Sequence, residues 1–529
     1  MKSIRILDCT LRDGGFVNNW KFGHDCIINI LGRLDRAKID IVEVGYLRNN
    51  AEYDKDSTEF PDTKSIAKSF TNKNYNAMLV AIIDYGKCDF EKISPKNYTI
   101  IDGIRLTFRK DEIDDALLLA EKIMQLGYKL FLQPVAITDY NSSEVVAFIE
   151  KANLINPYAV CMVDTYGFMT KQDLIRFFYL FDTTLNDNIF LGYHSHNNFQ
   201  LSYANAVELI EQTSNRGLIV DATVFGIGKG AGNLNTELIT SYVNHNLYEK
   251  YDVNQILEII SIYIAEEKRK HEWGYNLRYF LSALTDSHHQ YANYLLSKKT
   301  LSIEAITSIL SKIRKDKKTR YDEKYIENLY NEYQCVEIND ENSLDSISKE
   351  LLNKTILLIG PGESICEESE KINTFIKIKK PKIIAINNLL DGYKPNILFV
   401  SNAIRYSQIE DEVSCYDMSC TKIIATSNIS PTSLKPDWVV NYKSLLAINN
   451  SEVEDSSALM LLRLLIKVGV LEVYVAGLDG YGEREGYYKR GIALSSNLIG
   501  KTALIKEQIN KLAEHINIRY ITKSKYEEL

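Results

Sequence analysis

The sequence predicts an α/β protein with an N-terminal (β/α)8 TIM barrel, a helical extension and a smaller C-terminal Rossmann-like α/β domain. Three observations carry this prediction. Short apolar runs alternate with segments of helical periodicity, which is the pattern of parallel βα units. Eight such units fit into roughly the first 240 residues, the usual size of such a barrel. The 529 residues of the chain leave ample length for a further domain.

Eight barrel strands are expected, at residues 4–9, 41–45, 78–83, 103–107, 129–134, 159–163, 189–193 and 218–224. Amphipathic stretches at 112–126, 143–152, 171–180 and 201–212 are expected to be the helices between them. Further helices are expected at 253–271, 272–298 and 302–313, followed by a charged connector. We therefore predict three parts: the barrel at 1–245, a helical extension and connector at 246–349, and the second domain at 350–529.

The second domain repeats the alternating pattern, with strands expected at 355–359, 382–387, 397–401, 422–426, 438–441 and 470–476. The first of these leads into Gly360-Pro361-Gly362, where backbone N–H groups at a helix start can hold phosphate. A plain strand-to-helix turn explains these residues equally well. With the Gly and Asp residues of segment 475–481, the domain resembles Rossmann-type transferase domains that handle nucleotide-activated sugars. The sequence does not identify its cofactor or its role.

Composition excludes several classes of function. The net charge is -8 and the pI is about 5.7, which gives no basic surface for nucleic acid. No stretch approaches the ~20 apolar residues that a membrane span needs. The eight cysteines are scattered without a metal-binding or disulfide spacing, so free thiols are expected. These features predict a cytoplasmic protein without a nucleic-acid or membrane partner.

Residues with metal-binding chemistry follow three of the predicted barrel strands, at the end where such barrels place their active sites. The first strand leads into Arg12 and Asp13, and the seventh into His194 and His196. Alternate strand residues point to the same side, so the two imidazoles can converge. With the Asp13 carboxylate they would hold a divalent ion with open positions for substrate. The glycine-rich loop after the eighth strand can add the amide oxygen of Asn233 as a further ligand.

Each of these features has an ordinary structural explanation when taken alone. A single His-x-His pair is more often structural, Asp-Gly after a strand is commonly a turn, and a glycine loop can merely cap a strand. Together, at three strand ends of one eight-unit pattern, they favour the metal site.

The segments DCTLRDGG, YHSHNN and FGIGKGAGN resemble the metal-dependent lyase branch of TIM barrels, over about residues 1–300. That superfamily includes 4-hydroxy-2-oxoacid aldolases, 3-hydroxy-3-methylglutaryl-CoA lyase and 2-isopropylmalate synthase, and it contains the pyruvate carboxyltransferase-type domain. The resemblance implies metal ligands at Asp13, His194 and His196, with Asn233 as a further ligand. It implies that Arg12 stabilises the enolate oxygen formed at the reacting bond, which agrees with the charge that develops there.

Two departures leave the subfamily open. The aldolases carry a catalytic histidine where this chain has Phe16, and His24, Tyr46, Asp84 or a metal-bound water remain as alternative bases. The synthases have a Glu-Arg pair where this chain has Lys229-Gly230.

Further polar residues near the strand ends are candidates for substrate binding. They are Glu43, Arg105, Gln133 and the pair Asp164-Thr165, with a place in the packed layers of the barrel or a loop-anchoring role as the alternative. Arg105 is the strongest candidate for a substrate carboxylate, because a guanidinium matches a planar anion. His288 and His289 could reach over the site together with Tyr291, although surface or packing positions are expected for them.

The resulting functional hypothesis is a metal-dependent carbon-carbon lyase, an aldolase that acts next to a 2-oxo acid through a metal-stabilised enolate. Mn2+ or Mg2+ is the expected ion, with Zn2+ as the alternative. The expected partners are a 2-oxo acid such as pyruvate, an aldehyde and further copies of the same chain. The alternatives are an acyl-CoA-dependent condensing synthase, and a degenerate barrel with the activity in the C-terminal domain.

Overall fold

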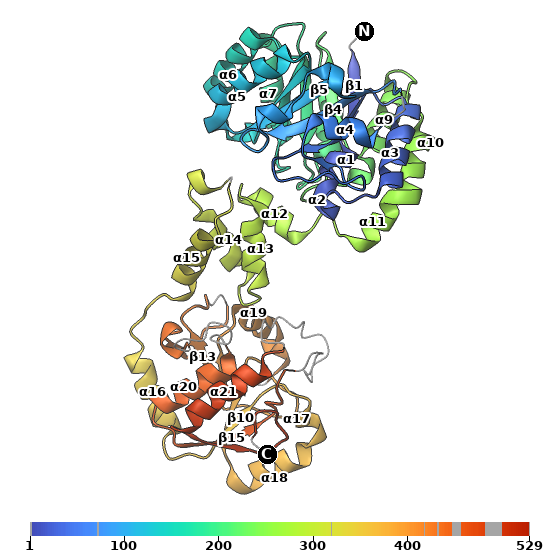
Figure 1. Cartoon of the computed structure of the whole chain (residues 1–529). Coiled ribbons are helices and arrows are strands. Elements are labelled where there is room, and N and C mark those ends of the chain that lie inside the picture. Colours follow the sequence, from blue (N-terminus) through green and yellow to red (C-terminus); the bar gives the residue numbers. More distant parts are fainter. Residues whose placement is uncertain are drawn as a thin grey trace. The chain divides into compact units, whose positions relative to one another are not determined.

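The structure is a computed structural model that describes residues 3–70, 74–318, 320–416, 418–430, 433–446, 456–481 and 500–527. The chain divides into two compact units, Met1–His289 and Gln290–Leu529, and Figure 1 shows their elements. This boundary falls within the segment 246–349, for which the sequence predicts a helical extension. The three-part division itself stays a prediction.

Unit 1 is a closed barrel of eight parallel strands, as the sequence predicts. The strands pair in the order β1-β9-β8-β7-β6-β5-β4-β2, and β1 closes the barrel by pairing with β2. A short strand, β3 (Glu59–Phe60), adds to β2. The barrel strands are β1 (Ile4–Asp8), β2 (Ile41–Leu47), β4 (Met78–Asp84), β5 (Gly103–Phe108), β6 (Lys129–Pro134), β7 (Ala159–Asp164), β8 (Phe190–Ser195) and β9 (Leu218–Ala222).

Strand β8 runs two residues further than the sequence suggests, and this extension matters for the site. His194 and Ser195 continue the parallel ladder with β7, opposite Val163 and Asp164. The first histidine of the His-x-His pair is therefore held in regular strand geometry at the carboxyl end of the barrel.

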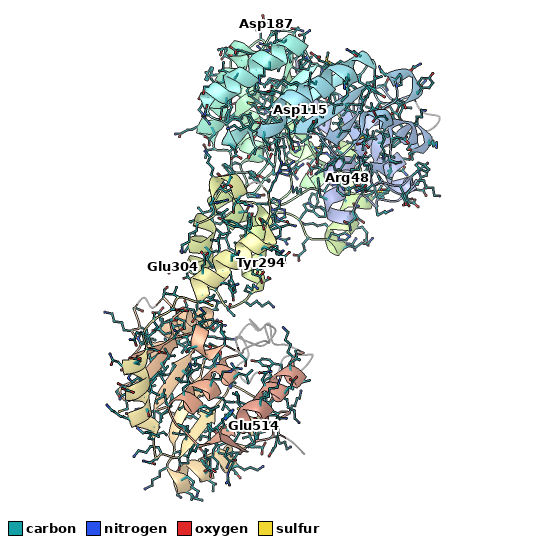
Figure 2. All side chains as sticks on the ribbon, turned by 60° about the vertical axis from the view of Figure 1, so that its left-hand side comes forward. Arg48, Asp115, Asp187, Tyr294, Glu304 and Glu514 are labelled. Carbon is teal, nitrogen blue, oxygen red and sulfur yellow. The ribbon has the colours of Figure 1, made fainter. Side chains whose placement is uncertain are left out.

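Helices surround the barrel because each buries one apolar side against the strands. Helices α6 and α7 begin with capping boxes, Asn141 with Glu144 and Thr170 with Asp173. The exposed faces carry charged side chains such as Asp115 of α5 (Figure 2). The helices are α3 (His24–Arg36), α4 (Thr63–Ser69), α5 (Ile113–Gln125), α6 (Ser142–Ile155), α7 (Lys171–Thr184), α8 (Ser202–Glu211) and α9 (Thr236–Asn246).

The interior of the barrel changes character along its axis. A buried cluster that includes Leu7, Ile41, Phe131 and Ile219 packs within the barrel. Closer to the carboxyl ends of the strands, buried charged and polar side chains take over, among them Glu43, Arg105, Gln133, His194 and Asp221. Because charges are rarely buried without a partner, this polar layer marks the functional end of the barrel.

After the barrel the chain continues as α10 (Val253–Ile259), a π-helical turn (Ile260–Ile264), α11 (Ala265–Lys270) and α12 (Leu277–Leu284). Within the described residues, none of the helices combines the length and the apolar character that crossing a bilayer requires.

Unit 2 begins after the first residue of helix α13 (His289–Ser297) and continues through α14 (Ile303–Ser311), α15 (Glu323–Gln334) and α16 (Glu341–Leu351). An open parallel sheet follows, with strand order β14-β13-β12-β11-β10-β15-β16. Its strands are β10 (Ile356–Ile359), β11 (Lys382–Ile386), β12 (Ile397–Val400), β13 (Lys422–Thr426), β14 (Trp438–Val440), β15 (Glu472–Ala476) and β16 (Asn517–Tyr520). The last strand was not expected from the sequence.

Both faces of this sheet are covered by helices. Ile356 and Leu358 pack with α16, α20 (Ser457–Lys467) and α21 (Thr502–Ala513). The alternate residues Leu357 and Ile359 pack with α18 (Ser369–Lys379) on the other face. The second parallel sheet that the sequence predicts is therefore confirmed, and its strand order reverses direction between β10 and β15.

Candidate active site

Asp13 lies at the centre of the polar layer, in the short helix α1 (Thr10–Asp13) that follows β1. Its Oδ2 atom is 3.1 Å from Arg12 Nη1 and 3.3 Å from His194 Nε2, and it accepts a 2.8 Å hydrogen bond from Asn233 Nδ2. Burial alone would raise the pKa of this carboxyl, but Arg12 and the hydrogen bond from His194 hold its pKa well below the usual value. Asp13 is thus an ionised carboxylate inside the barrel mouth.

His194 is oriented by a second carboxylate that sequence reasoning did not single out. Its Nδ1 atom lies 3.0 Å from Asp221 Oδ2, which leaves Nε2 facing Asp13. Burial opposes protonation, but the hydrogen bonds to Asp13 and Asp221 raise the pKa of His194 above its ordinary value. The signal was an acidic residue in the otherwise apolar strand β9, whose sequence is LIVDA.

His196 and Asn233 lie beside this pair. The ring of His196 is 5.3 Å from that of His194, and its Nδ1 is 2.8 Å from Asn233 Oδ1. Burial lowers the pKa of His196 to about 4, so the imidazole is neutral. Asn233 reaches this place through the loop that follows β9. Gly232 in that loop has a φ of +82°, and a Cβ there would lie 2.2 Å from the oxygen of Gly226.

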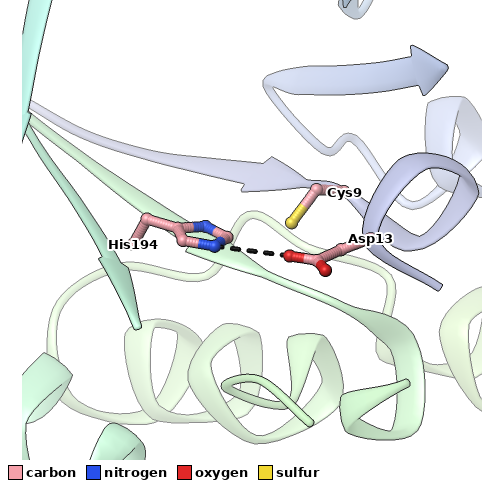
Figure 3. Close-up of side chains that lie close together, drawn as sticks. All are labelled: Cys9, Asp13 and His194. Carbon is pink, nitrogen blue, oxygen red and sulfur yellow. Dashed lines mark ion pairs between the residues drawn. The ribbon is translucent and has the colours of Figure 1, made fainter. Parts of the chain in front are cut away.

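These residues fit a divalent ion. A metal-bound histidine commonly donates its other N–H to a carboxylate, which is the arrangement of His194 and Asp221. Ligand atoms of Cys9, Asp13 and His194 all lie within 4.8 Å of one another (Figure 3). The Cys9 thiol donates to the Ala222 carbonyl, and burial raises its pKa well above the ordinary value. Because a thiol must ionise to bind metal, Asp13 and the histidines are the better donors.

Arg12 is held in place from several sides. Its Nε donates a 2.5 Å hydrogen bond to Glu43, and its backbone oxygen accepts a 2.9 Å bond from the Trp20 indole. Its side chain is almost fully buried. Its third nitrogen, Nη2, has no partner within the described part of the chain, so it can donate to a substrate oxygen.

The residues predicted to bind substrate form a charge network inside the barrel. Arg105 is 3.0 Å from Glu43 Oε2 through Nη1, and its Nη2 pairs with Asp221. Its guanidinium is only 1% exposed. Arg105 therefore already has two carboxylate partners, and its contact with a substrate carboxylate stays a prediction, as does that of Glu43.

Gln133 and Asp164 have structural partners. Gln133 Nε2 lies 2.7 Å from Cys161 Sγ. Asp164 accepts hydrogen bonds from the amides of Phe168 and Met169 and so holds the turn after β7. Burial raises the pKa of Asp164 to about 7. Substrate contacts of these two residues also stay predictions.

Phe16 packs on Trp20 with ring centroids 4.9 Å apart and is partly exposed. Of the alternative bases, Asp84 is paired with Lys87 at 2.7 Å, and burial raises the pKa of Tyr46. His24 begins helix α3. None of these three shares a described contact with Asp13 or His194, whereas the side chain of Lys229 lies over Phe16, with Nζ 5.5 Å from the ring centre.

The glycine turn of the second domain follows β10. The amide and hydroxyl of Ser364 both donate to the Asp479 carboxylate, at 2.8 and 2.5 Å. The Ser364 amide, one of the helix-start N–H groups proposed from the sequence to bind phosphate, therefore already donates to a carboxylate of the same chain. Phosphate binding at this turn stays a prediction.

The fold and this site define a TIM barrel with a carboxylate–histidine centre at the carboxyl ends of its strands. Residues 104–262, from β5 to the helices after β9, match the family model described as HMGL-like. Relatives include 4-hydroxy-2-oxovalerate aldolase of Chloroflexus aggregans, 25% identical over 50% of this chain and 75% of the relative. Oxaloacetate decarboxylase of Mycobacterium tuberculosis is 24% identical over 45% of this chain and 68% of the relative. The barrel is thus related to aldolases and lyases.

Two solved structures align with part of this chain. One is the N-terminal domain of a Bacteroides vulgatus protein assigned as an aldolase, which is 26% identical. The alignment covers 57% of this chain and 99% of that one, with a TM-score of 0.49. The other is HMG-CoA lyase from Brucella melitensis, 13% identical over 51% of this chain and all of that one, with a TM-score of 0.41.

Proposed function

We propose that the barrel is a divalent-metal-dependent aldolase that makes or breaks the carbon-carbon bond next to a 2-oxo acid through its enolate. The observation that carries this proposal is the arrangement of Asp13, His194 and Arg12 in one buried mouth, with His194 oriented by Asp221. Asp13, His194 and His196 would hold the ion, with Asn233 beside them. A divalent ion bound there would act as a Lewis acid on the 2-oxo group.

Arg12 supplies the second part of the chemistry. Negative charge develops on the oxygen of the 2-oxo group as the enolate forms, and a fixed donor aimed at that oxygen stabilises it. Glu43 and the Trp20 indole hold Arg12 so that little reorganisation is needed. The unpartnered Nη2 is the atom that we assign to the substrate.

The proposal includes the partners predicted from the sequence, a 2-oxo acid such as pyruvate and an aldehyde. Homo-oligomerisation, a cytoplasmic location and the preference for Mn2+ or Mg2+ over Zn2+ also remain proposals.

The test measures metal content and pyruvate methyl-proton exchange in deuterated buffer, in the full-length protein. The wild type is expected to bind about one Mn2+ per chain and to exchange only with the metal present. The variant His194→Ala/His196→Ala should lose both properties. His245→Ala, at an exposed histidine of α9, serves as the matched control and should lose neither.

Exchange that persists without metal would refute the metal role. Metal binding without exchange would point instead to an acyl-CoA substrate, and absence of bound metal would favour a barrel without this chemistry.

A further inference from the structure

A cavity of about 300 Å³, including its open mouth, lies at the carboxyl end of the barrel. One of its walls is His196, so it borders the candidate active site. Lys229 of the loop after β9 lines it, and so do Ser282 of α12 and the pair His288-His289 that follows. All of these residues belong to unit 1. We call this space the Lys229 cavity.

The lining is rich in hydrogen-bond donors and lacks acidic groups. It contains one lysine and three histidines, and no aspartate or glutamate. Lys229 Nζ forms no ion pair with any carboxylate in the described ranges, and it lies over the Phe16 ring. The nearest acidic influences on Lys229 come from Asp13, which is engaged by Arg12, and Asp84, which is paired with Lys87.

Besides the Lys229 cation, the cavity is lined by the imidazoles of His288 and His289, which can act as neutral hydrogen-bond donors. Their rings stack with centroids 4.6 Å apart, and His289 also packs edge-on against Tyr279. Burial, together with the charge of Lys229, lowers the pKa of His288 to about 4 and that of His289 to about 3. No hydrogen bond joins the His289 ring to another group in the described part of unit 1. Its N–H therefore remains available to a ligand.

A partly buried cation without a carboxylate partner is costly, because it loses hydration without gaining an ion pair. No carboxylate among the described residues pairs with Lys229, but a ligand in the cavity can supply the anion. Lysine is suited to this as a compact charge, and neutral imidazoles can add hydrogen bonds to the same oxygen atoms.

We propose that the Lys229 cavity binds the anionic end of the second substrate, an aldehyde that carries a phosphate or carboxylate group. This inference rests on the proposed aldolase function, since it assigns the acceptor of that reaction. Lys229 pairs with the anion, and His289 donates a hydrogen bond to it. The aldehyde carbon then faces His196 and the enolate site.

The experiment has a binding arm and a kinetic arm, both on the full-length metal-loaded protein. Calorimetry measures binding of inorganic phosphate and of succinate. Initial rates of aldol addition with pyruvate compare glyceraldehyde 3-phosphate, succinic semialdehyde and the neutral butanal. The variants are Lys229→Met, Lys229→Arg and the control Lys171→Met, an exposed lysine that begins α7 and pairs with Glu208.

We expect the wild type to bind at least one of the anions and to prefer the matching anionic aldehyde over butanal. Lys229→Met should weaken anion binding and reduce that preference on the order of 10-fold or more, the usual scale for a charge-assisted hydrogen bond. Lys229→Arg should restore much of both, and Lys171→Met should resemble the wild type. Whether phosphate or succinate binds more tightly identifies the anionic group.

Three results would overturn the proposal: no binding of either anion to the wild type, equal binding to Lys229→Met, or equal loss of rate with charged and neutral aldehydes. The last result would assign Lys229 to the chemical step. If pyruvate exchange fails while Lys229-dependent anion binding persists, the anion site stands and the aldolase function is what fails.

Discussion

Replacing Asp221 with asparagine should weaken metal binding although Asp221 is not a proposed ligand. Its Oδ2 atom accepts from His194 Nδ1 at 3.0 Å and pairs with Arg105. Asparagine keeps the shape but loses the charge. Its amide can present an N–H to His194, which favours the tautomer whose Nε2 carries the proton and cannot bind an ion.

Two magnitudes follow for Asp221→Asn. Loss of a carboxylate that orients a metal-bound histidine typically weakens metal affinity 10- to 100-fold, or about 1.4–2.7 kcal/mol. The change also removes one of the two carboxylate partners of the buried Arg105. Breaking a buried ion pair costs about 3–5 kcal/mol. We expect roughly 3 kcal/mol at 25 °C, the low end of that range, because Glu43 remains 3.0 Å from Arg105.

The assay combines a Mn2+ titration, which gives the metal affinity, with urea unfolding, which gives the free energy of unfolding of the barrel. Asp182→Asn is a matched control, because Asp182 Oδ1 accepts a 3.1 Å hydrogen bond from the buried Arg216 and has no histidine partner among the described residues. It should lower stability without changing metal affinity. Asp221→Asn with wild-type Mn2+ affinity would refute the view that Asp221 sets the orientation of His194. Equal affinity losses in both variants would trace the effect to general destabilisation.

Three further predictions concern individual side chains. Arg12→Ala should keep bound Mn2+ but lower turnover by roughly 10²–10³, as for loss of one oxyanion donor; turnover near that of the wild type, measured at saturating pyruvate, would contradict the enolate role. Cys9→Ser should leave Mn2+ affinity within about threefold, because a buried neutral thiol is a poor ligand, and a larger loss in the titration would make Cys9 a ligand. His289→Asn should flatten the fall in stability toward acid pH. The folded-state pKa of His289, about 3, lies below its ordinary 6.5, so the unfolded chain binds more protons and destabilises the wild type as the pH drops below 6.5. Urea unfolding at pH 7 and pH 5 measures this, and parallel pH curves for the two proteins would rule it out.

The barrel could be predicted from sequence because its signals are local. Each strand is a short apolar run between amphipathic helices, and the structure confirms both this alternation and the eight barrel strands. The sequence predicts the ends of the strands less accurately. The expectation for β8 stopped at Tyr193, because a polar His-Ser-His segment resembles a loop, whereas pairing with β7 extends the strand through Ser195. In the second sheet, β16 was missed since its sequence, NIRY, is short and half polar.

In the candidate site, too, residues in local motifs could be predicted from the sequence, whereas contacts between distant strands could not. Asp13, His194, His196 and Asn233 could be proposed because they sit in compact motifs at strand ends, and the structure brings them into one hydrogen-bonded group. The sequence could not show that two carboxylates from other strands, Glu43 and Asp221, face Arg105, whose substrate contact stays a prediction. Such cross-barrel partners are 62 and 116 positions away from it along the chain, which is beyond any local pattern.

Phe16 links the candidate metal site to the Lys229 cavity. The resemblance implies a histidine one turn after Asp13, where this chain has the aromatic ring of Phe16. The cation of Lys229 lies over that ring from the loop after β9, the strand next to β1. An aromatic face attracts a cation but does not neutralise its charge, so Lys229 keeps its need for an anion. Phe16, in the short helix α2 (Gly15–Asn18) after β1, therefore stands where the resemblance implies a base and contacts a charged side chain at the mouth. Arg12, Asp13 and His194 keep their mutual contacts beside Phe16, which agrees with the proposal that the site is functional and takes an anionic substrate.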